Sequence, residues 1–305
     1  MIRQLTLPTL ALLLAAPLAP LAAQQRTTGG QELDWRGRIR SGGTLRVFNT
    51  NGAVRVEPTD SDEATARSQT RGSEAERERV ILEVIEDGDG VTICARRENQ
   101  RCTPDGLRSE GRSSWNERER SGTATLTVGL PRGVDLRASS GNGAVTVTHA
   151  GADVHASSGN GDVQVNGAAG AVRATSGNGA VTVTDAGRGV TASSGNGRVV
   201  ISTAEGPVKA SSGNGSVDVR MQSLRGSENM EFTSGNGRVT VRLPASFTGQ
   251  LDLSTGHGSA YSDFPVTVQG RLQPTRLRGA VGDGRGPTVR LRSGNGSVEV
   301  RKLDG

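Results

Sequence analysis

Residues 172–189 read V-R-A-T-S-G-N-G-A-V-T-V-T-D-A-G-R-G, and this stretch decides the fold. Residues 172–175 form a short predicted strand, and residues 180–184 form a second one with β-branched residues in alternation. Between them, Ser176-Gly177-Asn178-Gly179 is a predicted turn, because glycine adopts positive φ freely and asparagine tolerates it. Residues 185–189 make a second turn. The side chains expected to point inward are Val172, Ala174, Val181 and Val183, and those expected to point outward are Arg173, Ala180, Thr182 and Thr184.

The tetrapeptide Ser-Gly-Asn-Gly recurs along the chain, and its first five copies begin 18 residues apart. Thr255-Gly256-His257-Gly258 is an altered copy, and Asn49-Thr50-Asn51-Gly52 looks like a decayed one. A strict period of this kind marks a repeat architecture. The seven unaltered copies begin at Ser140, Ser158, Ser176, Ser194, Ser212, Ser234 and Ser293.

Two all-β folds place two strands in each unit. In an antiparallel meander, each Asn-Gly would close a hairpin. In a parallel β-solenoid with about 18 residues per coil, equivalent residues would stack about 4.8 Å apart. The strict spacing favours this β-helix-like solenoid, because only stacking requires each copy to match the next. Its asparagine amides would then form a ladder of hydrogen bonds, made by Asn142, Asn160, Asn178, Asn196, Asn214, Asn236 and Asn295.

The chain divides into three predicted parts. Residues 1–23 are a signal peptide, residues 24–130 an irregular N-terminal β cap with polar insertions, and residues 131–305 the Ser-Gly-Asn-Gly repeat solenoid. The cap would shield the first coil edge from other strands. Within it we expect two strands over residues 45–56 and a hairpin of residues 80–85 and 90–94. The polar segment 60–79 is expected to be a solvated loop or helical excursion, and 98–122 a long loop.

The N-terminus predicts export. A positively charged start precedes a mostly apolar run over residues 5–21, and Leu21-Ala22-Ala23 offers a small-residue cleavage site before Gln24. A retained anchor is the alternative, but three prolines and the short length of the run argue against it. No cysteine follows the run, which argues against a lipoprotein. We expect no membrane span after removal of the leader, and a location in the periplasm, at the cell surface or outside the cell.

The cysteines agree with export. Cys94 and Cys102 are the two cysteines of the chain. A close, even pair in an oxidising compartment is typical of a disulfide. A metal site would need further ligands nearby, and the three histidines lie far away in the sequence. A redox pair would favour the C-x-x-C spacing. We therefore predict a disulfide between Cys94 and Cys102.

Composition limits the partners. The chain holds two Trp, one Tyr and four Phe, too few for the aromatic platforms on which nucleic-acid bases stack, so we expect no nucleic-acid partner. The net charge is +5, and residues 131–305 carry 18 basic and 13 acidic groups. This half could attract anionic polymers. The other interpretation is a solvated surface of mixed charge.

The residues now support a resemblance. Residues 136–145, L-R-A-S-S-G-N-G-A-V, open a run of V-x-A-[ST]-S-G-N-G units, preceded by Gly129-Leu130-Pro131. Arg242-Leu243-Pro244 leads in the same way into residues 251–256. Residues 40–305 thus resemble a β-strand-repeat domain of unknown function that carries the label of a bacterial adhesin. The resemblance implies a parallel β-solenoid on an exported or envelope protein, and no catalytic residue.

Enzymatic chemistry is the alternative, because polysaccharide lyases and hydrolases also use β-helices. Paired carboxylates must lie within about 5–10 Å of each other. Asp162 and Asp218 would be three coils apart, which is at least about 14 Å. Asp153 and Asp185 fall at different offsets of the second turn. The units also lack the regular aspartate of calcium-binding repeats and the lysine of phosphate loops, so we expect no catalytic residue, no metal and no cofactor.

The function expected from the sequence is therefore that of an exported, non-enzymatic, adhesin-like β-solenoid. It would bind an anionic polysaccharide or another envelope component on an outward strand face. The alternative is a carbohydrate-active β-helix enzyme, a lyase or hydrolase. The sequence does not set the oligomeric state. The residues expected to form the ligand face are Arg198, Arg220 and Arg238.

Overall fold

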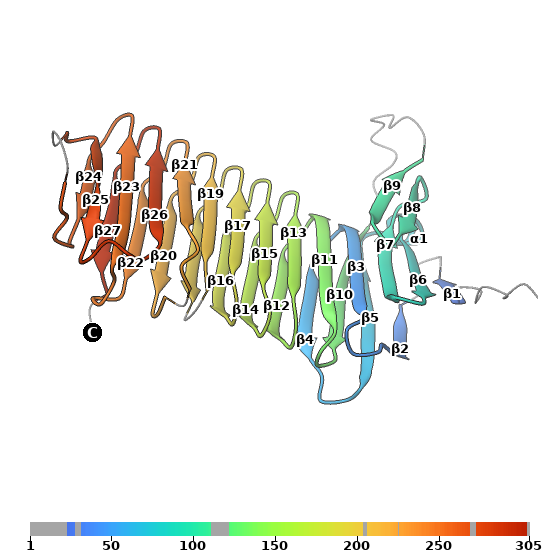
Figure 1. The fold of residues 1–305 in the computed structure, drawn as a ribbon. Helices are drawn as coiled ribbons and strands as arrows, with labels where there is room; N and C mark the ends of the chain where they lie inside the picture. Colours follow the sequence, from blue (N-terminus) through green and yellow to red (C-terminus); the bar gives the residue numbers. More distant parts are fainter. Residues whose placement is uncertain are drawn as a thin grey trace, which may run out of the picture.

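The computed structural model describes residues 23–27, 32–110, 122–203, 206–224, 226–268 and 273–303. In this part of the chain, strands form two long sheets that face each other and one two-stranded sheet (Figure 1). The predicted leader lies outside the described residues, apart from Ala23. One short α-helix, α1 (Glu74–Glu78), is present among the described residues, and no helix there is long and apolar enough to cross a membrane.

The 13-stranded sheet, called the front sheet below, faces the viewer in Figure 1. Its neighbours run in spatial order as β1 (Ala23–Thr27), β6 (Ile81–Asp87), β7 (Gly90–Arg96), β3 (Thr44–Asn51), β11 (Asp135–Asn142), β13 (Val154–Ser158), β15 (Val172–Ser176), β17 (Val190–Ser194), β19 (Val208–Ser212), β21 (Met230–Ser234), β26 (Thr288–Ser293), β23 (Gly249–Thr255) and β25 (Arg276–Val281).

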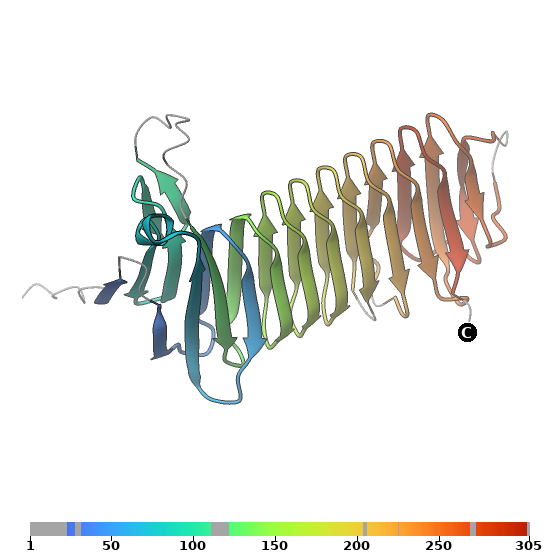
Figure 2. The same ribbon diagram turned by 180° about the vertical axis from the view of Figure 1, so that it is seen from behind.

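The 12-stranded sheet, called the back sheet, faces the viewer in Figure 2. Its spatial order is β2 (Asp34–Arg38), β5 (Glu63–Arg71), β10 (Thr123–Leu130), β4 (Val54–Pro58), β12 (Val145–Ala150), β14 (Val163–Ala168), β16 (Val181–Ala186), β18 (Val199–Thr203), β20 (Val217–Met221), β22 (Val239–Leu243), β27 (Val298–Lys302) and β24 (Ala260–Ser262). The small sheet pairs β8 (Gln100–Thr103) with β9 (Gly106–Ser109).

The repeat strands pair in parallel and in register. On the back sheet, Val145 pairs with Val163, and Val163 pairs with Val181, so each partner lies one 18-residue unit further along the chain. On the front sheet, Val154 pairs with Val172 in the same way. The chain therefore alternates between the sheets, and the antiparallel meander is not the arrangement that the structure shows.

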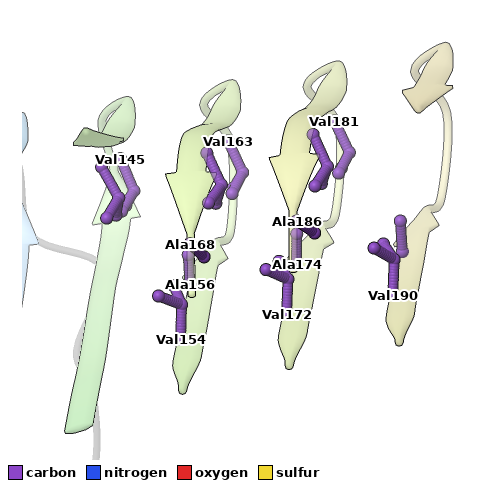
Figure 3. Packing of buried hydrophobic residues seen from close by; sticks show 14 of the residues in the cluster. Val145, Val154, Ala156, Val163, Ala168, Val172, Ala174, Val181, Ala186 and Val190 are labelled. Carbon is purple, nitrogen blue, oxygen red and sulfur yellow. The ribbon is translucent and has the colours of Figure 1, made fainter. Parts of the chain in front are cut away.

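The core is a set of valine and alanine columns between the sheets (Figure 3). In one unit, Val172 and Ala174 of β15 face Val181 and Val183 of β16, and none is more than 2% exposed. Burial of a valine side chain contributes about 1.5–3 kcal/mol. Larger side chains close the ends of the core, with Trp35 at one end and the edge-to-face pair of Phe247 and Phe264 at the other. The predicted inward positions are therefore buried.

The reason for glycine in the turns differs from the prediction. No glycine of the seven Ser-Gly-Asn-Gly turns has the positive φ of the left-handed region, and neither do their asparagines. Close stacking requires the glycines instead. A Cβ built on Gly179 would lie 2.3 Å from the carbonyl oxygen of Gly161 in the preceding unit, closer than real Cβ atoms approach. Positive φ of a non-glycine residue occurs near the ends of β12 and β16, at His149 and Asp185.

Two predictions for the N-terminal region are wrong in part. Within residues 60–79, the predicted helical excursion is present as α1 over residues 74–78, but residues 63–71 form β5, which pairs antiparallel with β10. The inward residues of β5 include Ala64 and Ala66, which are buried but carry little apolar signal in the sequence. The segment 98–122 begins with the β8–β9 hairpin, while residues 111–121 lie outside the described part. The two strands over 45–56 and the hairpin over 80–94 are present as β3, β4, β6 and β7.

The spatial order of strands departs from sequence order at both ends. Near the N-terminal end, β3 lies between β7 and β11, and β4 between β10 and β12. Near the C-terminal end, β26 lies between β21 and β23, and β27 between β22 and β24. The chain thus builds the outer strands β23 to β25 before its last two strands enter between them and the repeats. Both sheets also continue across residue 130, and a domain division there stays a prediction.

Candidate functional site

The asparagines of the turns lie in one row along the edge of the solenoid. The side-chain amide of Asn160 donates to the side-chain oxygen of Asn142 at 2.7 Å, and Asn178 donates to Asn160 at 2.6 Å. The same bond continues through Asn196, Asn214, Asn236 and Asn295. These amides are exposed and satisfy one another, which suits a structural role.

A second ladder, of serines, was missed by sequence reasoning. The Ser176 hydroxyl donates to the carbonyl oxygen of Gly161 at 2.8 Å and accepts the backbone N–H of Gly179 at 2.8 Å. The serine is 7% exposed, so it satisfies two backbone groups where water has little access. The signal was the invariant first letter of the tetrapeptide. Where the motif is altered, Thr255 donates to the carbonyl oxygen of Gly296 and Asn49 to that of Ala124, each in the neighbouring unit.

The predicted disulfide is present. Cys94 of β7 is bonded to Cys102 of β8. Both sulfurs lie in a small apolar cluster with Phe48, on the outer side of the front sheet. The disulfide therefore ties the β8–β9 hairpin to that face.

The structure places two of the three predicted ligand residues in one groove on the back sheet. Arg198 and Arg238 lie on either side of Ser216, two strands apart, because the strands that follow them pair in register. Both line a groove with a volume of about 810 Å³. Arg220 does not line this groove. It lies on β20 in register with Arg242 on β22, which in turn is in register with Arg301 on β27. The other lining residues that carry charge are Asp218, Arg242, Asp263, Glu299, Arg301 and Lys302.

Ion pairs, both across strands and within one strand, occupy most of the charges in this groove. The Arg242 guanidinium lies 2.5 Å from Asp218, and Arg301 lies 3.0 Å from Glu299. Arg238 reaches Glu299 at 3.7 Å, but 65% of its side chain is exposed. Arg198 is exposed and has no ion pair with any described residue. Arg198 is therefore free to meet an anion, and Arg238 is only loosely held.

An exposed aromatic side chain contacts Arg301, one of the residues that line the groove. Tyr261 is 46% exposed, and the Arg301 guanidinium lies 4.7 Å from the centre of its ring. A hydrogen bond with Asp263, together with the charge of that carboxylate, raises the pKa of Tyr261 above its ordinary value of 10.0. The phenol therefore stays protonated at neutral pH and can donate a hydrogen bond.

The carboxylates considered for catalysis do not come together. Asp153 accepts the backbone N–H of Ala171 and Asp162 that of Ala180, each at 2.8 Å. Asp218 pairs with Arg242, and Asp185, with a φ of 53°, lies near the end of β16. Across the described ranges, no group of three or more His, Cys, Asp or Glu residues is placed to hold a metal ion.

Comparisons with known proteins find a family and two solved structures of low similarity. The model of a family described as Toastrack DUF4097 matches residues 44–301. A "putative cell adhesion protein" from Clostridium sporogenes ATCC 15579 is 12% identical over 90% of this chain and 100% of its own, with a TM-score of 0.30. A "putative adhesin" from Bacteroides fragilis NCTC 9343 is 10% identical over 90% of this chain and 97% of its own, with a TM-score of 0.38. No curated protein matches. Likeness at these TM-scores supports no inference about activity.

Proposed function

Since the chain belongs to the Toastrack DUF4097 family, we propose that it is an exported, adhesin-like and non-enzymatic interaction module that binds anionic glycans. The observation that carries this proposal is the groove of the back sheet, where Arg198 and Arg238 stand two strands apart. A rigid parallel sheet holds both side chains in place. Its outward positions can differ from coil to coil without disturbing the core, which is how repeat proteins build binding surfaces.

The charge of the groove favours an acidic ligand. The five basic side chains that line it outnumber its three carboxylates. Arg198 has no ion pair among the described residues, and Arg238 is mostly exposed, so binding an anion breaks no strong contact. Attraction between exposed charges is screened over about 10 Å at 0.1 M salt, so such binding should depend on ionic strength.

The groove supports a binding role better than a hydrolytic one. Its three carboxylates each face an arginine: Asp218 faces Arg242, while Asp263 and Glu299 both face Arg301. Such pairing accounts for their positions without a reaction. The alternative of a carbohydrate-active enzyme is kept as an outcome of the experiment below.

Export is part of the proposal. The leader-like residues 1–23 and the disulfide between Cys94 and Cys102 support it, because structural disulfides persist in oxidising compartments. The periplasm, the cell surface and the medium all meet this condition.

Retention on immobilised alginate, a linear polyuronate, tests the proposed function. We expect the variant R198Q/R220Q/R238Q to elute at a lower salt concentration than the parent protein, with an unchanged circular dichroism spectrum. R38Q/R40Q/R132Q is the matched control, because it removes the same charge from exposed arginines elsewhere. Equal retention of the parent and the groove variant would overturn the proposed site. Release of unsaturated or reducing sugar ends by the parent protein would favour the enzyme.

A further inference from the structure

The outer face of the front sheet carries a row of five side chains on neighbouring strands. One side chain comes from each of the strands β11, β13, β15, β17 and β19, and each is in register with the side chain on the next strand. Every second strand therefore presents a cation. The row, called the front row below, consists of Arg137, His155, Arg173, Thr191 and Lys209.

The spacing of these cations follows from the sheet. Neighbouring strands lie about 4.8 Å apart, so cations on alternate strands recur about every 9.6 Å. Because each pairing is in register and parallel, Arg137, Arg173 and Lys209 form one straight line along the solenoid axis. The hydrogen-bonded sheet fixes this spacing, and the line from Arg137 to Lys209 spans four strand intervals.

Arg173 and Lys209 are exposed, and Arg137 is half-buried with its guanidinium 5.9 Å from the centre of the Phe48 ring. Within the described residues, none of them forms an ion pair, whereas the same column is neutralised at both ends. Arg46 on β3 lies 3.3 Å from Asp87, and Arg290 on β26 lies 3.2 Å from Asp252. Glu231 on β21 stands beside Lys209 and ends the basic row. The unpaired cations are thus confined to one segment, and they lie on the opposite side of the molecule from the groove of the back sheet.

A groove runs along the front row. It has a volume of about 560 Å³ and is lined by all five members of the row. Small residues, among them Ala171 and Gly189, line its flank at the second turns. Three carboxylates also line it: Asp135 accepts the backbone N–H of Asp153, Asp153 accepts that of Ala171, and Glu228 is the third. An extended chain can therefore lie in the groove with its anions against the cations.

We propose that the front row binds an extended, β-linked polysaccharide that presents a carboxylate at every second sugar. One pyranose of such a chain is about as long as one strand interval, so a disaccharide spans the distance between two cations. His155 and Thr191 stand between the cations and can bond the hydroxyls of the intervening sugars. The inference rests on the proposed function for its class of ligand, and it adds a second face with a defined spacing.

A variant that conserves charge tests the spacing. In T191K/K209T the lysine moves one strand closer to Arg173, and the net charge stays the same. Both positions are exposed, so the fold should tolerate the exchange. The probe is a hyaluronan octasaccharide, in which uronate and neutral sugars alternate, measured by titration calorimetry at low salt. We expect the dissociation constant to rise about tenfold, as for the loss of one charge-assisted contact.

The controls separate this inference from the proposed function. R198Q/R220Q/R238Q should leave the front row unchanged, and so should keep its octasaccharide affinity. A neutral chito-oligosaccharide and a polyglutamate with the same number of carboxylates should both bind at least tenfold more weakly than the octasaccharide. Equal affinity of T191K/K209T and parent, or equal affinity for polyglutamate, would overturn the spacing match. Loss of octasaccharide binding in R198Q/R220Q/R238Q alone would leave the proposed function standing and remove the front row.

Discussion

His155 is the titratable member of the front row. It lies half-buried between Arg137 on β11 and Arg173 on β15. Its burial, and then the charges of these two arginines, lower the pKa of its imidazole below the ordinary 6.5. Three carboxylates, Asp135, Asp153 and Glu228, also line the groove. The imidazole is therefore neutral at physiological pH, when it can both donate and accept a hydrogen bond.

This lowered pKa makes the folding stability depend on pH. In the window between the folded-state pKa and the unfolded value near 6.5, the unfolded chain binds more protons. The contribution of His155 to the free energy of unfolding is therefore complete above that window and is lost as the pH falls through it. We expect H155Q to lose less stability than the parent between about pH 8 and about pH 5, measured by urea unfolding. Parallel pH profiles of the two proteins would contradict this.

At the scale of the element, the turn contains two hydrogen-bond ladders that contribute differently to the free energy of unfolding. Ser176 is buried and satisfies the backbone groups of Gly161 and Gly179, whereas the amide of Asn178 is exposed. We expect S176A to lower the free energy of unfolding by about 1–3 kcal/mol, because it leaves buried groups unpaired. N178A should cost about 1 kcal/mol or less, because water can replace the lost bonds. Urea unfolding of both variants checks this, and a larger loss in N178A would contradict it.

The sequence predicts the elements that repeat better than those that do not. Strands β15 and β16 begin within one residue of their predicted starts, because neighbouring units repeat the same alternation. Strand β5 was not predicted because its buried positions hold alanine and serine. Their burial follows from the pairing with β10 rather than from their own hydrophobicity. The serine ladder was not predicted because each serine hydroxyl donates to a carbonyl oxygen of the preceding unit. Only the stacking of the units brings these two groups close together.

The candidate site was predictable only in part, for a reason of the same kind. An offset from the turn correctly places Arg198 and Arg238 in one column, on either side of Ser216. The offset does not predict which of these two arginines lies near a carboxylate. Arg238 faces Glu299 because β27 lies beside β22, although Arg238 and Glu299 are 61 positions apart in the chain. Sequence order would have placed β24 there instead.

At the scale of the whole molecule, the last coil joins the repeats to the outer strands. Strands β26 and β27 contact β21 and β22 on one side and β23 and β24 on the other. In a linear array, stability comes from each unit and its interfaces with its neighbours. Removal of this coil deletes two interfaces and leaves β23 hydrogen-bonded only to β25 in the front sheet.

Two deletions of equal length test this arrangement. Removal of residues 288–305 should expose residues 230–287 to proteolysis and give a broad thermal transition. Removal of residues 172–189, which is one internal unit, should leave a cooperative transition. Ala171 is then followed by Val190, which is the equivalent of Val172 in the next unit, so the flanking units can stack on each other. Circular dichroism and limited proteolysis compare the two variants. Equally cooperative melting of both would show that the last coil is not needed to hold the outer strands.

The position of the last coil also decides how the molecule would carry a mechanical load. Strand β27 runs parallel to both of its neighbours and is bonded to each of them. A pull along the strand at its C-terminal end therefore strains two rows of hydrogen bonds together. An edge strand pulled across its length would open one bond at a time, like a zipper. Here the force meets a lap joint loaded in shear, with the outermost strands clamping the end of the chain against the body of the repeats.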